Sequence, residues 1–180
     1  MAEEPVFHRA DATIRRLRSI DEAQVEGLAD LLVDSVDAGA SVGFMHPLTK
    51  AKAVAFWRSV ADGVAVGERA LLIAEDETGI VGTVHLMLAL PENQPHRADL
   101  TKMLVHPRAR RRGLGAALME AAEEMARECG RTLLVLDTVT GSDAERLYAR
   151  LGWIRVGEIP DFALLAHGGL WGTMVFYKKL

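Results

Sequence analysis

A strand, a basic turn and a helix follow one another between residues 98 and 129, and this unit constrains the fold more than any other part of the chain. The strand ends in the apolar stretch LTKMLV (100–105), and the turn HPRARRRG (106–113) leads into the helix. The helix GLGAALMEAAEEMAREC (113–129) carries apolar residues at helical spacing, and Gly130 provides a stop. Its predicted apolar stripe consists of Leu114, Leu118, Ala122, Met125 and Cys129.

Three further helices are predicted from apolar spacing and from their end signals. One helix runs over 21–38 and stops at Gly39, and a second begins after Thr49 as its cap and ends near Gly67. A third spans 142–152, with Ser142 as the cap and Gly152 as the stop. The residues predicted to be buried in the first two helices are Val25, Leu28, Leu32 and Val36, and then Val54, Trp57, Ala61 and Val64.

Apolar, β-rich segments predict the strands around these helices. The predicted strands are 13–20, a hairpin of 70–76 and 80–90, then 98–105, 132–138, 153–159 and 173–179. The order β-α-α-β-β-β-α-β-α-β-β predicts an α/β fold of the α+β type, with helices on both faces of a mixed, mostly antiparallel sheet of about six to seven strands. At 180 residues, the chain is expected to form one domain over 1–180.

Composition limits the function classes. Twenty-one basic and 25 acidic residues give a net charge of −4, so no overall basic field attracts nucleic acid, and we expect none as a partner. The single cysteine, Cys129, rules out an internal disulfide framework and fits a reducing cytoplasm. The acidic first ten residues do not resemble a signal peptide, and no apolar run approaches the roughly 18 residues of a membrane span. We therefore expect a cytoplasmic protein that binds no membrane.

The basic turn has the chemistry of an anion-binding site. The first amides of a helix lack partners within the helix, and the helix dipole is positive at that end. Gly113 and Gly115 let a phosphate approach the backbone, and the arginines add donors and charge. The P-loop pattern is absent, and the dinucleotide pattern fails because its third glycine falls on Leu118. A solvated basic loop and a nucleic-acid patch remain alternatives on the turn alone.

The remaining pattern, Arg110-x-x-Gly113-x-Gly115, resembles the R/Q-x-x-G-x-G/A signature of the GNAT superfamily of N-acetyltransferases. In that superfamily the loop amides bind the pyrophosphate of acetyl-coenzyme A (acetyl-CoA), and the preceding strand splays from its neighbour to receive the pantetheine arm. The resemblance implies the GNAT fold, acetyl-CoA as cosubstrate and no metal. The coenzyme-binding residues that it implies are Met103, Leu104, Val105, Arg110, Arg111, Arg112, Gly113, Leu114, Gly115 and Ala116.

A second segment, AERLYARLGW (144–153), resembles the family pattern A-x-x-L-Y-x-x-x-G-F, with Trp153 in the aromatic place. It implies that Tyr148 lies near the coenzyme sulfur. A phenol, with an unperturbed pKa of about 10, can protonate a departing thiolate as a general acid. Many family members have asparagine where this chain has Gly141, so we expect Ser142 to supply the coenzyme contact instead.

A base must take the proton from the attacking ammonium. Asp99 shares the strand parity of Thr101 and Met103, and Asp137 ends the next predicted strand. Carboxylates at these strand ends can bind an amine and pass its proton to water. His85 and His106 are alternative bases, and each aspartate alone is equally compatible with a turn-capping role.

A closer resemblance, through GASVGFM (39–45), LDT followed by GS (136–142) and RVGEIP (155–160), is to the tabtoxin-resistance acetyltransferases, which acetylate a β-lactam amino-acid toxin. It implies active-site roles for Asp99 and Asp137, and loop position predicts a substrate wall from Ser41, Phe44 and Met45. The predicted activity is transfer of an acetyl group to a primary amine of a small molecule. The alternative is a non-catalytic module of the same fold that binds coenzyme A. A homodimer is compatible with the sequence.

Overall fold

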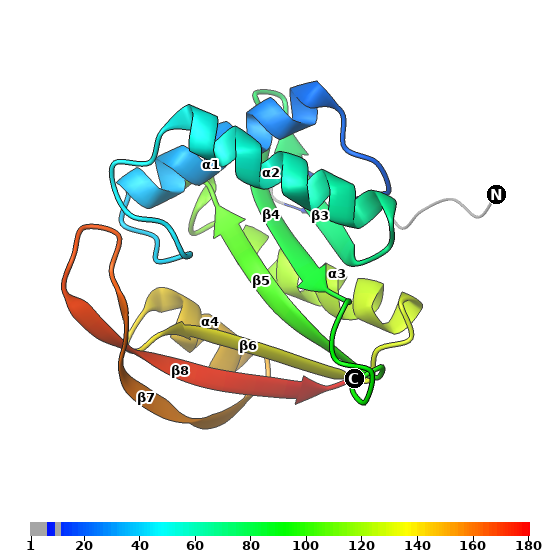
Figure 1. Cartoon of the computed structure of the whole chain (residues 1–180), viewed down its shortest axis with the longest axis vertical. Coiled ribbons are helices and arrows are strands. Elements are labelled where there is room, and N and C mark those ends of the chain that lie inside the picture. Colours follow the sequence, from blue (N-terminus) through cyan, green and yellow to red (C-terminus); the bar gives the residue numbers. More distant parts are fainter. Residues whose placement is uncertain (1–6, 10–11) are drawn as a thin grey trace.

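The computed structural model describes residues 7–9 and 12–180, which form an eight-stranded sheet with four α-helices and one short 3₁₀ helix (Figure 1). The strands are β1 (Phe7–Arg9), β2 (Ala12–Leu17), β3 (Arg69–Asp76), β4 (Gly79–Met87), β5 (Arg97–Val105), β6 (Leu133–Val139), β7 (Ile154–Leu164) and β8 (Leu170–Lys179). The helices are α1 (Glu22–Asp37), α2 (Lys50–Ala65), η1 (Pro107–Ala109), α3 (Leu114–Glu128) and α4 (Asp143–Arg150).

The strand order is β1-β2-β3-β4-β5-β6-β8-β7, and every neighbouring pair is antiparallel except β5 and β6. The predicted mixed, mostly antiparallel sheet is therefore confirmed. The sheet has one strand more than the expected upper number because the three-residue β1 adds to its edge. So short a strand carries too few residues for an apolar pattern.

Two apolar cores cover the two faces of the sheet. Helices α1 and α2 pack on one face around Trp57 and Leu71, and α3 and α4 pack on the other around Leu118 and Phe176. The predicted stripe residues are buried, except that Ala61 and Cys129 are half-buried. Across the described residues, no helix is long and apolar enough to cross a membrane.

The helix ends follow the expected capping chemistry. Thr49 accepts a hydrogen bond from the Lys52 amide and Ser142 accepts one from the Glu145 amide, so both predicted caps are confirmed. Asp21 and Gln24 add a capping box to α1. The predicted stop glycines all adopt the positive φ that glycine tolerates best: Gly39, Gly67, Gly130 and Gly152.

Four predicted strand ends were wrong, and one of them is that of β4, which ends at Met87 and not at residue 90. Strand β2 ends at Leu17 and not at residue 20, because the chain turns there toward the Asp21 cap. Strand β7 continues past residue 159 to Leu164, and β8 already begins at Leu170. Strand β7 lies at the edge of the sheet. Proline has no amide hydrogen to donate, and an edge strand tolerates Pro160 because it pairs on one side only.

Candidate active site

Strands β5 and β6 pair over only three residues and then separate. The parallel register joins Arg97–Asp99 to 133–135, and no pairing continues beyond Asp99 (Figure 1). Residues 100–105 of β5 therefore have no β6 partner along one edge. Met103, Leu104 and Val105, which are predicted to bind the coenzyme, all lie in this unpaired part of the strand.

A β-bulge bends β5 on its other side. Thr83 faces Leu104 and His85 faces Thr101, so Lys102 and Met103 together oppose one residue of β4. Lys102 adopts a φ of 51°, in the left-handed region that residues with a side chain seldom occupy. The bulge turns the strand beside its unpaired edge.

The N-terminus of α3 lies directly after this strand and has free donors. Gly113 is the N-cap, with a φ of 81°, and no side chain caps the helix. Among the described residues, none accepts a hydrogen bond from the amides of Leu114, Gly115 or Ala116. Unpartnered first-turn amides of this kind are the donors that bind phosphate groups at helix N-termini.

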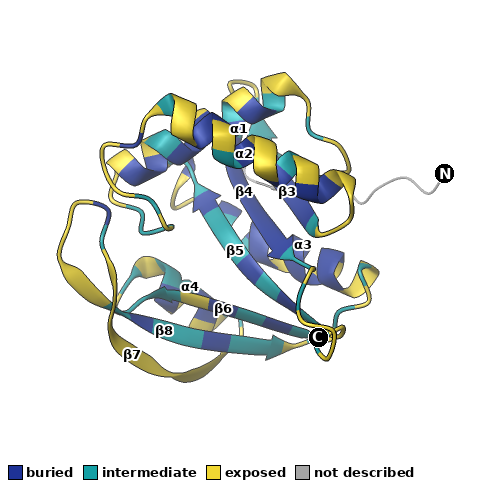
Figure 2. Ribbon diagram, viewed as in Figure 1, coloured by how far each residue is buried: buried dark blue, intermediate teal, exposed yellow. Residues whose placement is uncertain are grey.

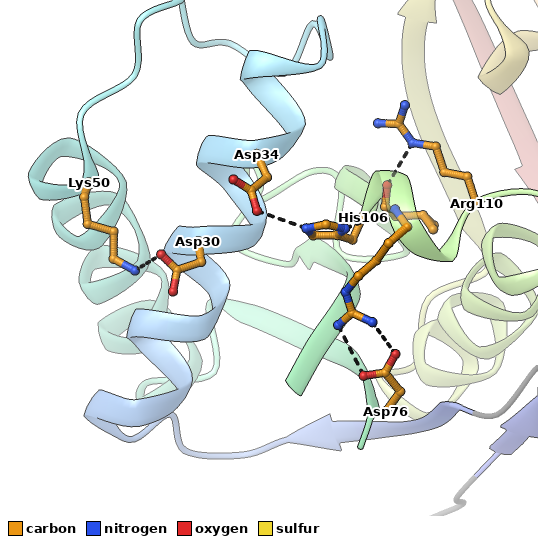
Figure 3. A network of polar contacts seen from close by, with 8 residues as sticks. Asp30, Asp34, Lys50, Asp76, His106 and Arg110 are labelled. Carbon is orange, nitrogen blue, oxygen red and sulfur yellow. Dashed lines mark hydrogen bonds and ion pairs between the residues drawn. The ribbon is translucent and has the colours of Figure 1, made fainter. Parts of the chain in front are cut away.

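The basic turn is fastened at three points (Figure 3). His106 accepts from the Arg108 amide through Nδ1, so its Nε2–H donates to Asp34 of α1, 3.0 Å away. Arg108 pairs with Asp76 of β3 at 2.5 Å and 3.2 Å. Arg110 Nε donates to the Val105 carbonyl at 3.1 Å. These contacts hold the turn between α1, β3 and the end of β5.

Arg111 and Arg112 differ from these fastening residues. Both are exposed, and neither forms a hydrogen bond or ion pair within the described part of the chain. Arg111 adopts a φ of 65°, and its charge lowers the pKa of Asp143 at the start of α4, after the larger effect of Arg146. The two side chains are thus free to meet a ligand at the α3 N-terminus.

The Arg108–Asp76 pair gives a pH-dependent contribution to stability. The hydrogen bond from Arg108, aided by Thr78, holds the pKa of Asp76 far below its ordinary value near 4. A group with a depressed folded pKa stabilises the fold above its unfolded pKa and loses this effect as the pH falls. We expect Asp76→Asn to lower the melting temperature at pH 7 and the difference to shrink below about pH 4. Melting curves of both proteins at pH 7, 5 and 3.5 check this, and a constant difference would contradict it.

Tyr148 lies on α4, 5% exposed, with its ring against Trp153 and Phe176. Burial raises the pKa of Tyr148 well above 10, and the negative charge of Asp137 raises it further. No described residue hydrogen-bonds its hydroxyl. The phenol is therefore protonated at neutral pH and able to donate.

Asp99 and Asp137 occupy the point where the strands separate. Asp99 is the last β5 residue paired with β6, and Arg97 contacts its carboxylate at 3.2 Å. Burial raises the pKa of Asp99, Arg97 lowers it, and the charge of Asp137 raises it again. Asp137 is exposed and accepts a hydrogen bond from Thr173 at 2.8 Å. Asp137 thus influences both Asp99 and Tyr148, which ties the three predicted catalytic residues together electrostatically.

The two histidines have other roles. Burial, with the charges of Lys102 and Arg69, lowers the pKa of His85 to about 3. That shift moves His85 away from the pKa near neutrality that suits a general base, whereas Asp99 moves toward it. His106 has both ring nitrogens engaged in holding the basic turn. The aspartates are the better candidates.

Comparison with known proteins decides the family. A family model described as the acetyltransferase (GNAT) domain matches residues 67–155. An uncharacterized N-acetyltransferase in the hisH-hisA intergenic region of Azospirillum brasilense is 33% identical over 129 residues, which cover 71% of this chain and 75% of the relative. The chain belongs to the GNAT acetyltransferase superfamily.

Two solved structures share the fold over nearly the whole chain. The yncA protein from Salmonella typhimurium, solved with its cofactor acetyl-CoA, superposes with a TM-score of 0.77 at 18% identity and covers 95% of each chain. A ribosomal-protein-alanine N-acetyltransferase from Brucella melitensis gives a TM-score of 0.76 at 22% identity, over 93% of this chain and 99% of that one. These likenesses confirm the predicted GNAT fold.

Apart from Tyr148, the residues in and beside the second GNAT motif (144–153) make contacts that mainly stabilise the fold. The indole of Trp153 donates to the buried Glu123 at 3.2 Å, and Lys178 contacts the same carboxylate at 2.7 Å, which ties α3 to β8. Gly141 adopts a φ of 79°, a conformation open to both glycine and asparagine. Ser142 accepts the Glu145 amide as the α4 cap, so its hydroxyl retains a proton to donate. The Thr138 hydroxyl lies 3.5 Å from it.

Two loops meet at the predicted substrate wall, and only the α1–α2 loop was expected there from the sequence. Phe44 of the α1–α2 loop packs edge-on against Phe56 at 5.2 Å, whereas Met45 is 42% exposed and Ser41 is half-buried. The tip of the β7–β8 hairpin reaches this loop, because the Ala166 carbonyl accepts from the His46 amide at 2.8 Å. The glycines at 168 and 169 signal a turn, but nothing in the sequence indicates where that turn docks. Within the described chain, no group of acidic, histidine or cysteine side chains could hold a metal.

Proposed function

We propose that this GNAT protein transfers the acetyl group of acetyl-CoA to a primary amine of a small molecule. One observation carries the proposal: the unpaired edge of β5 leads directly into the uncapped N-terminus of α3. The edge offers backbone groups to a chain of amides such as pantetheine, and the helix start offers donors to a pyrophosphate. Asp99 lies on the same strand, and the charge of Asp137 acts on both Asp99 and Tyr148.

The residues present fit the coenzyme. The amides of Gly113 through Ala116 and the guanidinium groups of Arg111 and Arg112 would hold the pyrophosphate. Arg110 would add positive charge beside the pyrophosphate from the end of β5, where its Nε already donates to the Val105 carbonyl. A side chain at Gly115 would approach Leu147 at 3.2 Å, so glycine keeps α3 close to α4 at this point. Ser142 would donate its remaining hydroxyl proton.

The bound coenzyme supplies a thioester that a neutral amine can attack directly, so the protein needs no nucleophile of its own. Asp99 and Asp137 would draw in the substrate ammonium and accept its proton, which then passes to water. Tyr148, neutral at pH 7, would donate its proton to the departing sulfur. The half-buried Cys129 accepts a hydrogen bond from Arg16 and takes no part.

The proposal extends to amino-acid-like amines, including β-lactam toxins of the tabtoxin type. It is tested by incubating the protein with acetyl-CoA and a panel of amines and measuring thiol release. Mass spectrometry of the product then shows whether nitrogen or oxygen carries the acetyl group. Amine-dependent release with an N-acetyl product is expected. Coenzyme binding without transfer to any amine would favour the non-catalytic module instead.

Asp99 should set the acidic limb of the pH profile. A general base acts only when deprotonated, and the raised pKa of Asp99 shifts that limb above the ordinary aspartate value near 4. We expect Asp99→Asn to lower kcat/KM by about 10- to 100-fold at pH 7 and to remove the limb. Rates between pH 4.5 and 9 check this, with Asp62→Asn on the exposed face of α2 as the control. An unchanged acidic limb would assign it to another group.

A further inference from the structure

Among the described residues that carry a side chain, Lys102 and Asp161 have a positive φ and no part in the proposed chemistry, and only Lys102 lies next to the candidate site. It stands at the β5 bulge with a φ of 51°, directly beside the unpaired edge. Strained backbone of this kind persists where the surrounding structure enforces it, and it gathers at functional sites. The bulge also redirects the side chain from the alternation of an ordinary strand.

Among the described residues, no carboxylate contacts the ammonium of Lys102. Its Nζ is 5.5 Å from the centre of the Phe56 ring, and it would lie 3.8 Å from a Cβ at Gly43 in the α1–α2 loop. It forms no hydrogen bond or ion pair with any residue that the structure describes. Lysine is seldom buried unless it is paired, so a half-buried and unpaired lysine calls for a partner from outside the chain.

Charged side chains of both signs act on Lys102. Burial lowers the pKa of Lys102, the charge of Asp137 raises it, and Arg69 lowers it further. Burial lowers the pKa of His85, and the charges of Lys102 and Arg69 lower it further. Positive charge therefore acts from Lys102 on β5 and Arg69 on β3, whereas Asp99 and Asp137 place negative charge where β5 and β6 separate.

We propose that Lys102 binds the carboxylate of an amino-acid acceptor whose amine faces Asp99 and Asp137. The inference rests on the proposed acetyl transfer and names its substrate class: a small molecule with a carboxylate close to its reacting amine. A cation and an anion on opposite sides of one site match the two charges of such a zwitterion. Gly43 leaves the space in front of the ammonium free of a side chain.

The test compares L-amino acids with their carboxamides, which keep the amine and lose the negative charge. Thiol release from acetyl-CoA is measured for wild type, Lys102→Met and Lys52→Met. Lys52 is the matched control, since its ammonium lies 5.8 Å from the Phe44 ring but on the exposed side of α2. Binding of the same compounds to the coenzyme A complex is followed by thermal shift, which does not require turnover.

Wild type and Lys52→Met should prefer the best amino acid over its carboxamide by about 10- to 100-fold in kcat/KM, because hydrogen bonds to charged groups are the stronger ones. Lys102→Met should lose this preference through a higher KM for the amino acid, with the carboxamide little affected. A preference that survives in Lys102→Met, or acceptors that need no carboxylate, would overturn the inference. Failure of acetyl-CoA to bind at all would instead refute the proposed function.

A second inference rests on a separate observation, the exposed apolar face of the β7–β8 hairpin. All of β7 is exposed, and it forms the edge of the sheet (Figure 2). The hairpin carries seven of the nine large apolar residues that are exposed in the described chain: Ile154, Val156, Ile159, Phe162, Leu164, Leu170 and Trp171. Soluble monomers seldom leave so large an apolar patch open.

We infer that a second copy of this chain covers the face, β7 against β7. Each of these seven side chains is 46–65% exposed, and a standard interface buries about 800 Å² on each partner, which takes a patch of several such residues. An edge strand that pairs with its own copy about a two-fold axis satisfies its free backbone groups and closes the assembly.

Sedimentation of the full chain tests this inference. Wild type at micromolar concentration should sediment at twice the 19.6 kDa of one chain. Phe162→Asp should sediment as a monomer with an unchanged circular dichroism spectrum. Val66→Asp, which alters a 70% exposed valine after α2, should remain dimeric. A monomeric wild type, or a Phe162→Asp dimer, would overturn the assignment.

Discussion

Tyr148→Phe is expected to lower kcat by about 100-fold or more while the Kd for acetyl-CoA changes by less than about threefold. The substitution removes one hydroxyl that has no hydrogen-bond partner among the described residues, and the ring stays packed against Trp153 and Phe176. The fold should therefore be preserved. The loss falls on kcat because a general acid acts when the sulfur departs and contributes little to binding.

The second tyrosine of the chain supplies the control. Tyr177 is half-buried on β8, opposite Ile154, and Tyr177→Phe should keep kcat within about twofold of wild type. Stopped-flow thiol release at saturating coenzyme and amine measures the chemical step for both variants. Equal rates for Tyr148→Phe and wild type would remove Tyr148 from the acid role and leave water as the donor.

Replacing Arg111 and Arg112 together by alanine should have the largest effect on coenzyme binding. Both guanidinium groups lack partners in the described chain, so they lose no contact on meeting a phosphate, and each charged hydrogen bond contributes on the order of 1.5–3 kcal/mol before solvent screening. We expect the Kd for acetyl-CoA to rise by about 10- to 100-fold, with kcat at saturation nearly unchanged. Calorimetric titration measures the change.

The control for this pair removes the same charge elsewhere. Arg58 and Arg127 are exposed on α2 and at the end of α3, and their double alanine variant should bind acetyl-CoA like wild type. Added salt should weaken acetyl-CoA binding more for wild type than for the Arg111/Arg112 variant, because the variant has lost two of the charges that salt screens. A similar loss in both double variants would mean that only overall charge matters.

The sequence predicted the fold well because its signals are local. Thr49, Ser142 and the four stop glycines act through neighbouring backbone groups, so capping rules place the helices. The β5–β6 separation was expected only through the family resemblance. No local pattern distinguishes the paired Asp99 from the unpaired Met103.

The sequence could not show which arginines of the basic turn hold the turn in place and which are free to bind a ligand. Arg108 and Arg110 hold the turn, whereas Arg111 and Arg112 are free, and that division depends on Asp76 and Val105, which approach only in the folded chain. Lys102 was missed for a similar reason. A bulge inserts one residue without any glycine or proline to mark it, and the surroundings of the ammonium come from α2 and the α1–α2 loop.

The most direct test of coenzyme binding at the α3 N-terminus is a thermal-shift titration with acetyl-CoA, run beside ATP, NAD and a short DNA duplex. At about one hundred times its Kd, a ligand stabilises the native state by roughly 2.7 kcal/mol, which corresponds to a shift on the order of 5–10 °C for a domain of this size. We predict such a shift for acetyl-CoA and a much smaller one for each of the other ligands. No shift with acetyl-CoA in the folded protein, or an equal shift with DNA, would contradict the account.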